Sequence, residues 1–229
     1  MSNQSPSSFK YLDIVASFFV SILVISNIAS SAKIVDMGFS VFNIPMVFDG
    51  GTLLFPFVYI LGDVLTEVYG FKTAKRVIWT GFAVMLLAAL VFFILGALPA
   101  ESLWETEVGS AAFNNIIGGM SYGGIVLASL AAYLTGEFSN AAVLSKLKVK
   151  MKGRFLPVRT IGSSLIGQLL DTGIFVIIAT IAGVFPWEIF WSLVLTNYIL
   201  KCVIEALMTP LTWLFSKFLK SKEGIDIYD

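Results

Sequence analysis

Long apolar segments alternate with short polar ones along most of this chain. A helix needs about 20 apolar residues to cross the hydrocarbon core of a bilayer. Six segments of roughly this length predict six membrane-spanning helices, at residues 11–32, 51–69, 74–97, 121–144, 160–184 and 188–215. The pattern predicts an all-α integral membrane protein with one six-helix transmembrane domain over residues 11–220. We expect a disordered N-terminal tail at 1–10 and a cytoplasmic C-terminal tail at 221–229.

The first apolar segment has a second interpretation. Residues 11–32 end in Ala29-Ser30-Ser31-Ala32, which is similar to a signal peptidase cleavage site. The apolar stretch is longer than the hydrophobic region of an ordinary signal peptide. We therefore interpret it as a membrane helix.

Two connecting segments follow other patterns. Residues 33–50 show partial apolar alternation around Asp36-Met37-Gly38, which predicts a short hairpin outside the hydrocarbon. Residues 98–120 are long for a loop, and their FNNIIGG sequence is compatible with an interfacial or a re-entrant piece.

Basic residues gather in loops that fall on one side of the six-helix arrangement. They follow the second, fourth and sixth spans and are densest between residues 146 and 159. The loop after the third span instead contains Glu101, Glu105 and Glu107. Because cytoplasmic loops carry an excess of Lys and Arg, we expect both termini to be cytoplasmic.

Composition agrees with a membrane location. Of the 229 residues, 57% are hydrophobic and 13% are charged, whereas a soluble domain carries about 25% charged residues. The 15 basic and 15 acidic residues balance, so charge gives no indication of a nucleic-acid partner. The chain lacks histidine, and its one cysteine, Cys202, cannot form an internal disulfide or a thiolate metal site. We expect no metal and no cofactor.

Polar side chains interrupt several spans near their middle. Asp63 and Glu67 lie one helical turn apart on the second span. Helical spacing places two further sets on one face each: Ser164, Gln168, Asp171 and Phe175 on the fifth span, and Asn197, Lys201 and Glu205 on the sixth. A charge at the bilayer centre costs roughly 2.5 to 3.5 kcal/mol on insertion scales. We therefore expect these faces to meet in a polar pocket, with Asn27, Glu137 and Asn140 as further candidates to line it.

Structural alternatives exist for most of these residues. Lys201 and Glu205 can form an ion pair within their own helix. Glu67 can neutralise Lys72 or Arg76 near the membrane surface, and the asparagines can hold helices together. Asp63 lies deeper, which favours contact with a ligand or with Lys201 across the bundle. Asp171 has no cation within a turn of its own helix, so its functional interpretation is the strongest.

Three blocks of the sequence resemble the queuosine precursor transporter family, also called the vitamin uptake transporter family. They read FPFVYILGDVLTEVYGFKTAKR, RTIGSSLIGQLLDTGIFV and NYILKCVIEALMTP. Their most specific elements are Asp63 with Glu67, Gln168 with Asp171, and Lys201 followed by Glu205. The likeness extends over nearly all six spans, whereas segments 33–50 and 98–120 carry no family motif.

The resemblance implies a bacterial inner-membrane importer of 7-cyano-7-deazaguanine and 7-aminomethyl-7-deazaguanine that works by alternating access. Its partners would be the 7-deazaguanine base and the lipid bilayer, with no nucleic acid and no ATPase subunit, and a homo-oligomer is left open. The substrate-binding residues would be Asn27, Asp63, Gln168, Asp171, Asn197 and Lys201. The base would stack on Phe55, Phe57, Tyr59 or Phe175. Glu67 and Glu205 are candidates for proton coupling or for ion pairs, and proton symport and uniport both stay open.

Two other functional classes fit the sequence less well. The substrate-binding subunit of an energy-coupling-factor vitamin transporter also has six helices, but the first span lacks the Ala-x-x-x-Ala motif of such subunits, and no ATP-binding P-loop occurs. An intramembrane aspartyl enzyme would need a G-x-G-D signature, and Ile60 stands where the first glycine should be. We expect that the protein is not an enzyme.

Overall fold

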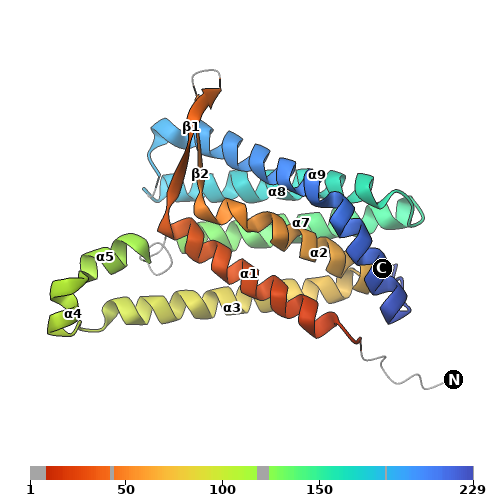
Figure 1. Cartoon of the computed structure of the whole chain (residues 1–229), viewed down its shortest axis with the longest axis horizontal. Helices are drawn as coiled ribbons and strands as arrows, with labels where there is room; N and C mark the ends of the chain where they lie inside the picture. Colours follow the sequence, from red (N-terminus) through yellow and green to blue (C-terminus); the bar gives the residue numbers. More distant parts are fainter. Residues whose placement is uncertain (1–8, 42–43, 118–123, 184, 229) are drawn as a thin grey trace.

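The protein is a bundle of long helices that run side by side (Figure 1). The computed structural model describes residues 9–41, 44–117, 124–183 and 185–228. Each predicted span coincides with one long helix: α1 (Leu12–Ala32), α2 (Phe55–Tyr69), α3 (Phe71–Ala97), α7 (Gly124–Lys150), α8 (Leu156–Ile181) and α9 (Phe190–Glu223). Within the described residues, four helical stretches are long and apolar enough to cross a membrane, namely Leu12–Ala32, Phe71–Ala97, Leu156–Ile181 and Trp187–Glu223. The chain is thus a predominantly α-helical membrane protein. Most of the predicted disordered tail lies outside the described residues.

The predicted hairpin is confirmed. Strands β1 (Ile34–Val41) and β2 (Ile44–Asp49) pair antiparallel, with Ile34 opposite Asp49, and the register shifts around Gly38, whose φ is +76°. A positive φ is strained for residues with a side chain, so glycine suits this irregular position. The hairpin projects from one end of the bundle (Figure 1), and the Ser192 hydroxyl donates a hydrogen bond to the Pro45 carbonyl.

The segment after α3 forms two short helices, α4 (Ser102–Glu107) and α5 (Gly109–Ile116), which have no buried residues. They extend from the same end of the bundle as the hairpin (Figure 1). The glycines of the FNNIIGG sequence lie outside the described residues. Because a re-entrant piece must be enclosed by protein or water, the exposed α4 and α5 agree better with an interfacial position.

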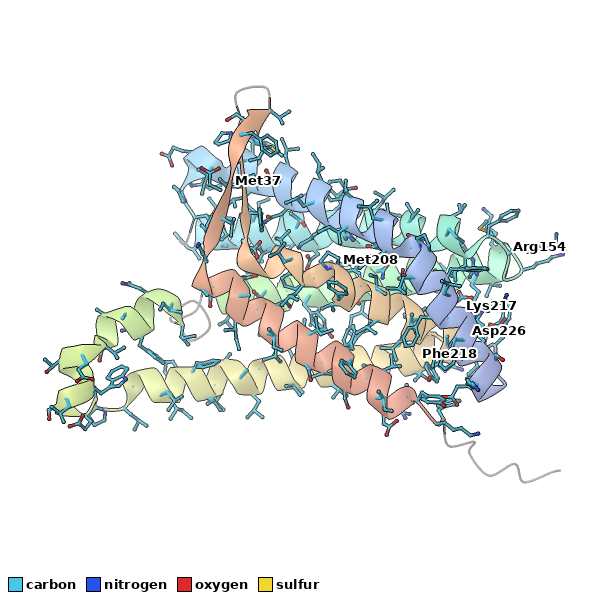
Figure 2. The ribbon with its side chains drawn as sticks, viewed as in Figure 1. Met37, Arg154, Met208, Lys217, Phe218 and Asp226 are labelled. Carbon is cyan, nitrogen blue, oxygen red and sulfur yellow. The ribbon has the colours of Figure 1, made fainter. Side chains whose placement is uncertain are left out.

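The basic loops and the two described chain ends lie at the opposite end of the bundle. The α7–α8 loop, with Arg154, and the end of α9, with Lys217 and Asp226, are at this end (Figure 2). Glu223 joins the two termini there, because its carboxylate accepts hydrogen bonds from the backbone N–H groups of Lys10 and Tyr11 at 2.9 and 2.8 Å. Glu223 is the last residue of α9, so this helix continues eight residues beyond the predicted end of the sixth span at residue 215.

Helix α2 lies in the interior of the bundle. It contacts α1, α3, α7 and α9, and nearly all of its residues from Pro56 to Tyr69 are buried. The 3-10 helix η1 (Gly50–Leu53) precedes it, so α2 begins at Phe55 rather than at residue 51 as expected. Phe19 and Leu23 of α1 pack with Val64, Leu65 and Val68 of α2 in the main apolar core. A short helix surrounded on all sides in this way must satisfy its polar groups inside the protein.

Helices α7 and α8 approach each other through Gly136 and Gly167. A Cβ atom on Gly167 would lie 2.8 Å from Asn140 Cβ and 3.0 Å from the Gly136 carbonyl oxygen. The same added atom would lie 3.1 Å from the ring of Tyr59 on α2. The contact between two small residues is typical of helix pairs in membranes.

This contact generates a stability prediction. We expect Gly167→Ala to lower the melting temperature of the detergent-solubilised protein, because overpacking costs about 1 to 3 kcal/mol. Gly173→Ala is the matched control on the same helix, since a Cβ there meets nothing within 4 Å. We expect the control to melt at or above the wild-type temperature, because alanine favours helix more than glycine does. Equal melting temperatures for the two variants would contradict the tight contact.

Candidate functional site

The predicted polar faces of α2, α8 and α9 meet inside the bundle. Lys201 of α9 forms an ion pair with Asp171 of α8, with 2.9 Å between Nζ and Oδ2. The same Nζ lies 4.6 Å from the centre of the Phe55 ring at the start of α2. Helices α8 and α9 thus meet through residues of their polar stripes, and the start of α2 adds the half-buried Phe55 ring.

Amide side chains hold the other two carboxylates of this region. Gln168 Nε2 donates to Glu205 Oε2, and the Cys202 thiol contacts Gln168 Oε1 at 3.1 Å. Asn140 Nδ2 donates to Asp63 Oδ1 at 2.8 Å, and its Oδ1 accepts from Ser164 at 3.3 Å. We call Asp63, Asn140, Gln168, Asp171, Lys201 and Glu205 the central polar cluster; each is at most 6% exposed.

Two pairings that the sequence left open as alternatives do not form. Lys201 pairs with Asp171 rather than with Glu205 on its own helix, because Asp171 offers its carboxylate directly across the α8–α9 interface. Asp63 does not pair with Lys201, and its partner is the Asn140 amide. Asp171 therefore has a structural partner from another helix, which the sequence of α8 alone does not reveal.

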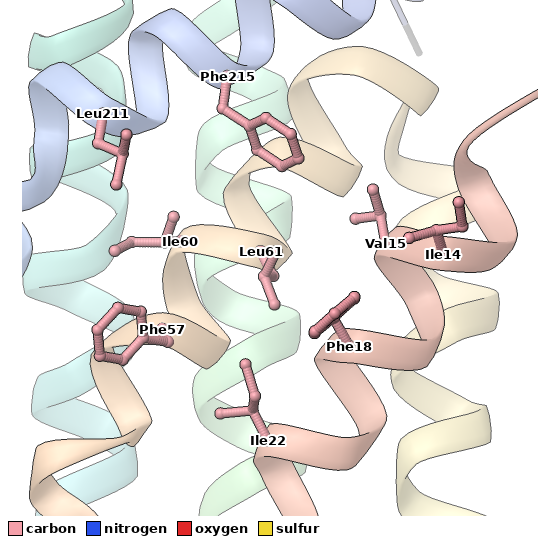
Figure 3. Close-up of a pocket in the computed structure, with 9 residues that line it drawn as sticks. All are labelled: Ile14, Val15, Phe18, Ile22, Phe57, Ile60, Leu61, Leu211 and Phe215. Atoms are coloured by element: carbon pink, nitrogen blue, oxygen red, sulfur yellow. The ribbon is translucent and has the colours of Figure 1, made fainter.

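The aromatic candidates divide into two groups. Phe55 and the buried Tyr59 border the cluster: the Tyr59 hydroxyl lies 2.7 Å from where a Gly136 Cβ would stand, and Asp171 Cβ is at the same distance from that point. Phe175 instead stacks edge-on against Phe185, with 5.9 Å between ring centres. Phe57 lines an apolar groove of about 390 Å³ on the outside of α1, α2 and α9 (Figure 3). Phe57 and Phe175 therefore do not face the cluster.

The last predicted residues lie toward the hairpin end. Asn197 Nδ2 donates to Asp49 Oδ2 at 3.0 Å, and Asn197 Oδ1 accepts from Thr52 at 3.2 Å. Asp49, which is 2% exposed, also accepts hydrogen bonds from the Ser30 hydroxyl and from the Gly51 backbone N–H. We call Ser30, Asp49, Thr52 and Asn197 the hairpin-end closure, since they join α1, η1 and α9.

Sequence reasoning missed Asp49 because it ends strand β2 rather than interrupting an apolar span. Asn27 is buried nearby on α1, one turn before Ser30–Ser31. Its Nδ2 donates to the Leu23 carbonyl, and its Oδ1 has no hydrogen-bond partner among the described residues.

A charged network closes the opposite end. Arg159 of α8 donates two hydrogen bonds to the Glu67 carboxylate, at 2.6 and 3.2 Å, and both side chains are at most 1% exposed. Lys220 of α9 also pairs with Glu67, and Lys148 of α7 donates to the Glu67 carbonyl at 2.6 Å. We call Glu67, Lys148, Arg159 and Lys220 the basic-end closure. The cations that the structure places against Glu67 thus come from α7, α8 and α9, whereas the alternative from the sequence was Lys72 or Arg76.

Asp226 adds a second carboxylate to this closure. It lies 2.6 Å from Lys148 Nζ and 2.9 Å from Lys220 Nζ. Partial burial acts to raise the pKa of Asp226, but the hydrogen bonds from the two lysines outweigh burial and hold that pKa below its ordinary value. The residues after α9 are therefore attached to the closure at neutral pH.

Comparison with known proteins adds independent findings. The model of a family described as "Putative vitamin uptake transporter" matches residues 49–215. A Bacillus subtilis (strain 168) protein named "Probable queuosine precursor transporter" is 26% identical over 174 residues, which are 76% of this chain and 73% of that protein. The "Queuosine precursor transporter" of Escherichia coli (strain K12) is 27% identical over 192 residues, covering 83% and 81% of the two chains. No solved structure matches the chain significantly.

The basic-end closure generates a second stability prediction. Arg159→Met removes the bidentate partner of a buried carboxylate, and breaking such a pair costs about 3 to 5 kcal/mol. We expect a clear loss of melting temperature in detergent. Arg154→Met is the control, because the Arg154 side chain is exposed and surface changes stay within about 0.5 kcal/mol. Glu67→Gln introduced together with Arg159→Met should recover part of the loss. If Arg159→Met melts like the control, the buried pair does not stabilise the bundle.

Proposed function

The chain belongs to the putative vitamin uptake transporter family, and on that premise we propose that it imports queuosine precursors across the bacterial inner membrane. Its substrates would be 7-cyano-7-deazaguanine and 7-aminomethyl-7-deazaguanine. The names of the relatives from two bacteria support this substrate class. They also describe transporters rather than enzymes. The protein would work without an ATPase subunit.

The observation that carries this proposal is the central polar cluster, which lies inside the region matched by the family model. A 7-deazaguanine base offers N–H donors and a carbonyl acceptor along its edge and an apolar ring face. Asp63, Asp171 and Gln168 supply acceptors and donors for such an edge. Phe55, beside Lys201, supplies a ring for stacking.

Alternating access is the mechanism that the arrangement of the polar groups favours. The hairpin-end closure and the basic-end closure flank the central polar cluster, and each joins helices that also line it. We propose that each closure opens in turn while the other holds. Asn197 would then control entry rather than hold the base, and Glu67 would serve as an ion-pair residue of the opposite closure. Asn27 stays a proposed substrate contact through its side-chain carbonyl oxygen, which has no hydrogen-bond partner among the described residues.

The orientation completes the proposal. All six long helices would cross the membrane. Helix α2 has only 15 residues, but the helices around it would shield it from lipid. Both termini, the α7–α8 loop and the basic-end closure would then be cytoplasmic by the positive-inside rule. The hairpin and α4–α5 would lie on the outer side.

Restoration of queuosine in tRNA tests the function directly. The gene is expressed in a bacterium that can neither make nor import the precursors, and each precursor is then supplied. We expect queuosine to return. Asp63→Asn should reduce uptake at least about tenfold, the effect of losing roughly 1.4 kcal/mol of substrate interaction, because the amide still accepts from Asn140 but has no charge. Asp13→Asn, at an exposed position, is the control. Absence of queuosine despite wild-type protein in the membrane would refute the function. Near-normal uptake by Asp63→Asn would refute its role.

Thiol labelling tests the orientation. In a Cys202→Ser background, single cysteines replace Ser102 on α4 and Lys150 at the end of α7, both exposed. A membrane-impermeant thiol reagent applied to intact cells should label position 102 only, and position 150 should react after the membrane is permeabilised. Labelling of both positions in intact cells would contradict the six-span orientation.

A further inference from the structure

One buried acid remains outside the groups described so far. Glu137 of α7 is 2% exposed, and neither of its carboxyl oxygens has a hydrogen-bond partner among the described residues. Its Oε2 lies 2.8 Å from the point where a Cβ on Gly62 would stand. The ring of Phe19 lies 3.6 Å from the same point. The carboxyl group is thus enclosed between α7, the backbone of α2 and an apolar side chain of α1.

Glycine at position 62 makes room for this carboxyl group. Any larger residue would place an atom against Glu137 Oε2. The next residue, Asp63, belongs to the central polar cluster, so Glu137 lies immediately behind the segment of α2 that borders the proposed base site. A change in the position of α2 would alter the surroundings of both groups together.

The groups around Glu137 do not neutralise it. The titratable side chains within electrostatic reach are Tyr59 and Asp63 on α2, Tyr133 on its own helix, Asp171 on α8 and Glu205 on α9. Tyr133 donates its hydroxyl hydrogen to the Ile78 carbonyl. Lys201, the cation of the cluster, is paired with Asp171 at 2.9 Å.

An ionised carboxylate in an apolar interior without a partner is so unfavourable that such groups become neutral instead. A proton is also the one ligand that requires no cavity. We infer that Glu137 is the proton-binding site of the transporter: it carries a proton while both closures are shut and exchanges it with water when one opens. This inference rests on the proposed function and assigns its energy source as proton symport.

Glu137 is a better proton site than the two acids suggested by sequence alone. Both carboxylate oxygens of Glu67 are taken up by ion pairs with Arg159 and Lys220. Glu205 has one oxygen, Oε2, that accepts from Gln168. Only at Glu137, among these three, are both oxygens without a partner in the described part of the chain.

The test uses the purified full-length protein in proteoliposomes with radiolabelled 7-cyano-7-deazaguanine. Counterflow, in which labelled base exchanges for unlabelled base inside, measures transport without net proton movement. Accumulation under a gradient one pH unit more acidic outside measures coupling. For one proton per base we expect wild-type accumulation of up to about tenfold, accompanied by alkalinisation outside the vesicles. Glu188→Gln, exposed in the short 3-10 helix Trp187–Ile189 before α9, should behave like the wild type.

Glu137→Gln imitates the protonated side chain and should keep its packing. We expect counterflow to continue in this variant, while the response to the pH gradient and the alkalinisation disappear. A gradient response like that of the wild type would overturn the assignment, as would loss of counterflow in a variant that melts normally, since that result would make Glu137 a base contact. A wild-type protein that exchanges base but ignores the gradient would also overturn it. Absence of wild-type counterflow would instead refute the proposed function.

Discussion

Charge buried in an apolar bundle has to be neutralised where it lies, and this constraint organises the interior of the protein. Removing one member of a buried pair is far more costly than losing a surface pair, because the remaining charge stays desolvated. Asp171 with Lys201, and Glu67 with Arg159, therefore fix how α2, α8 and α9 face one another. The apolar core of α1 and α2 buries surface without fixing which residues face one another, whereas these ion pairs fix the relative positions of the helices.

The basic-end closure and the hairpin-end closure differ in the strength of the contacts that join their helices. The basic-end closure combines several cations with Glu67 and Asp226. The hairpin-end closure depends on one carboxylate, Asp49, surrounded by hydroxyl and amide donors. Hydrogen bonds of this second kind are individually weaker than bidentate Arg–carboxylate contacts. The polar contacts at the two ends of the bundle are thus unequal in strength.

Much of this architecture could be predicted from the sequence. Apolar length located all six long helices, alternation around Gly38 located the hairpin, and helical spacing brought Gln168, Asp171 and Lys201 to one interface. The partners of the buried polar side chains are harder to predict, because spacing along one helix does not show which neighbouring helix it faces. The sequence places Arg159 at the end of a basic loop, yet its side chain is completely buried against Glu67. Asp49 was missed because its role depends on how β2 leads into α2.

Helix α2 has a consequence for the depth of the hairpin-end closure. At 1.5 Å per residue its 15 residues extend only about 22 Å, whereas a typical hydrocarbon core is about 30 Å thick. The missing length is made up by η1 and the end of β2, whose non-helical backbone is enclosed by α1 and α9. At membrane depth, irregular backbone persists only inside protein or beside water. A helix as short as α2 therefore depends on α1 and α9 to cover the backbone that precedes it.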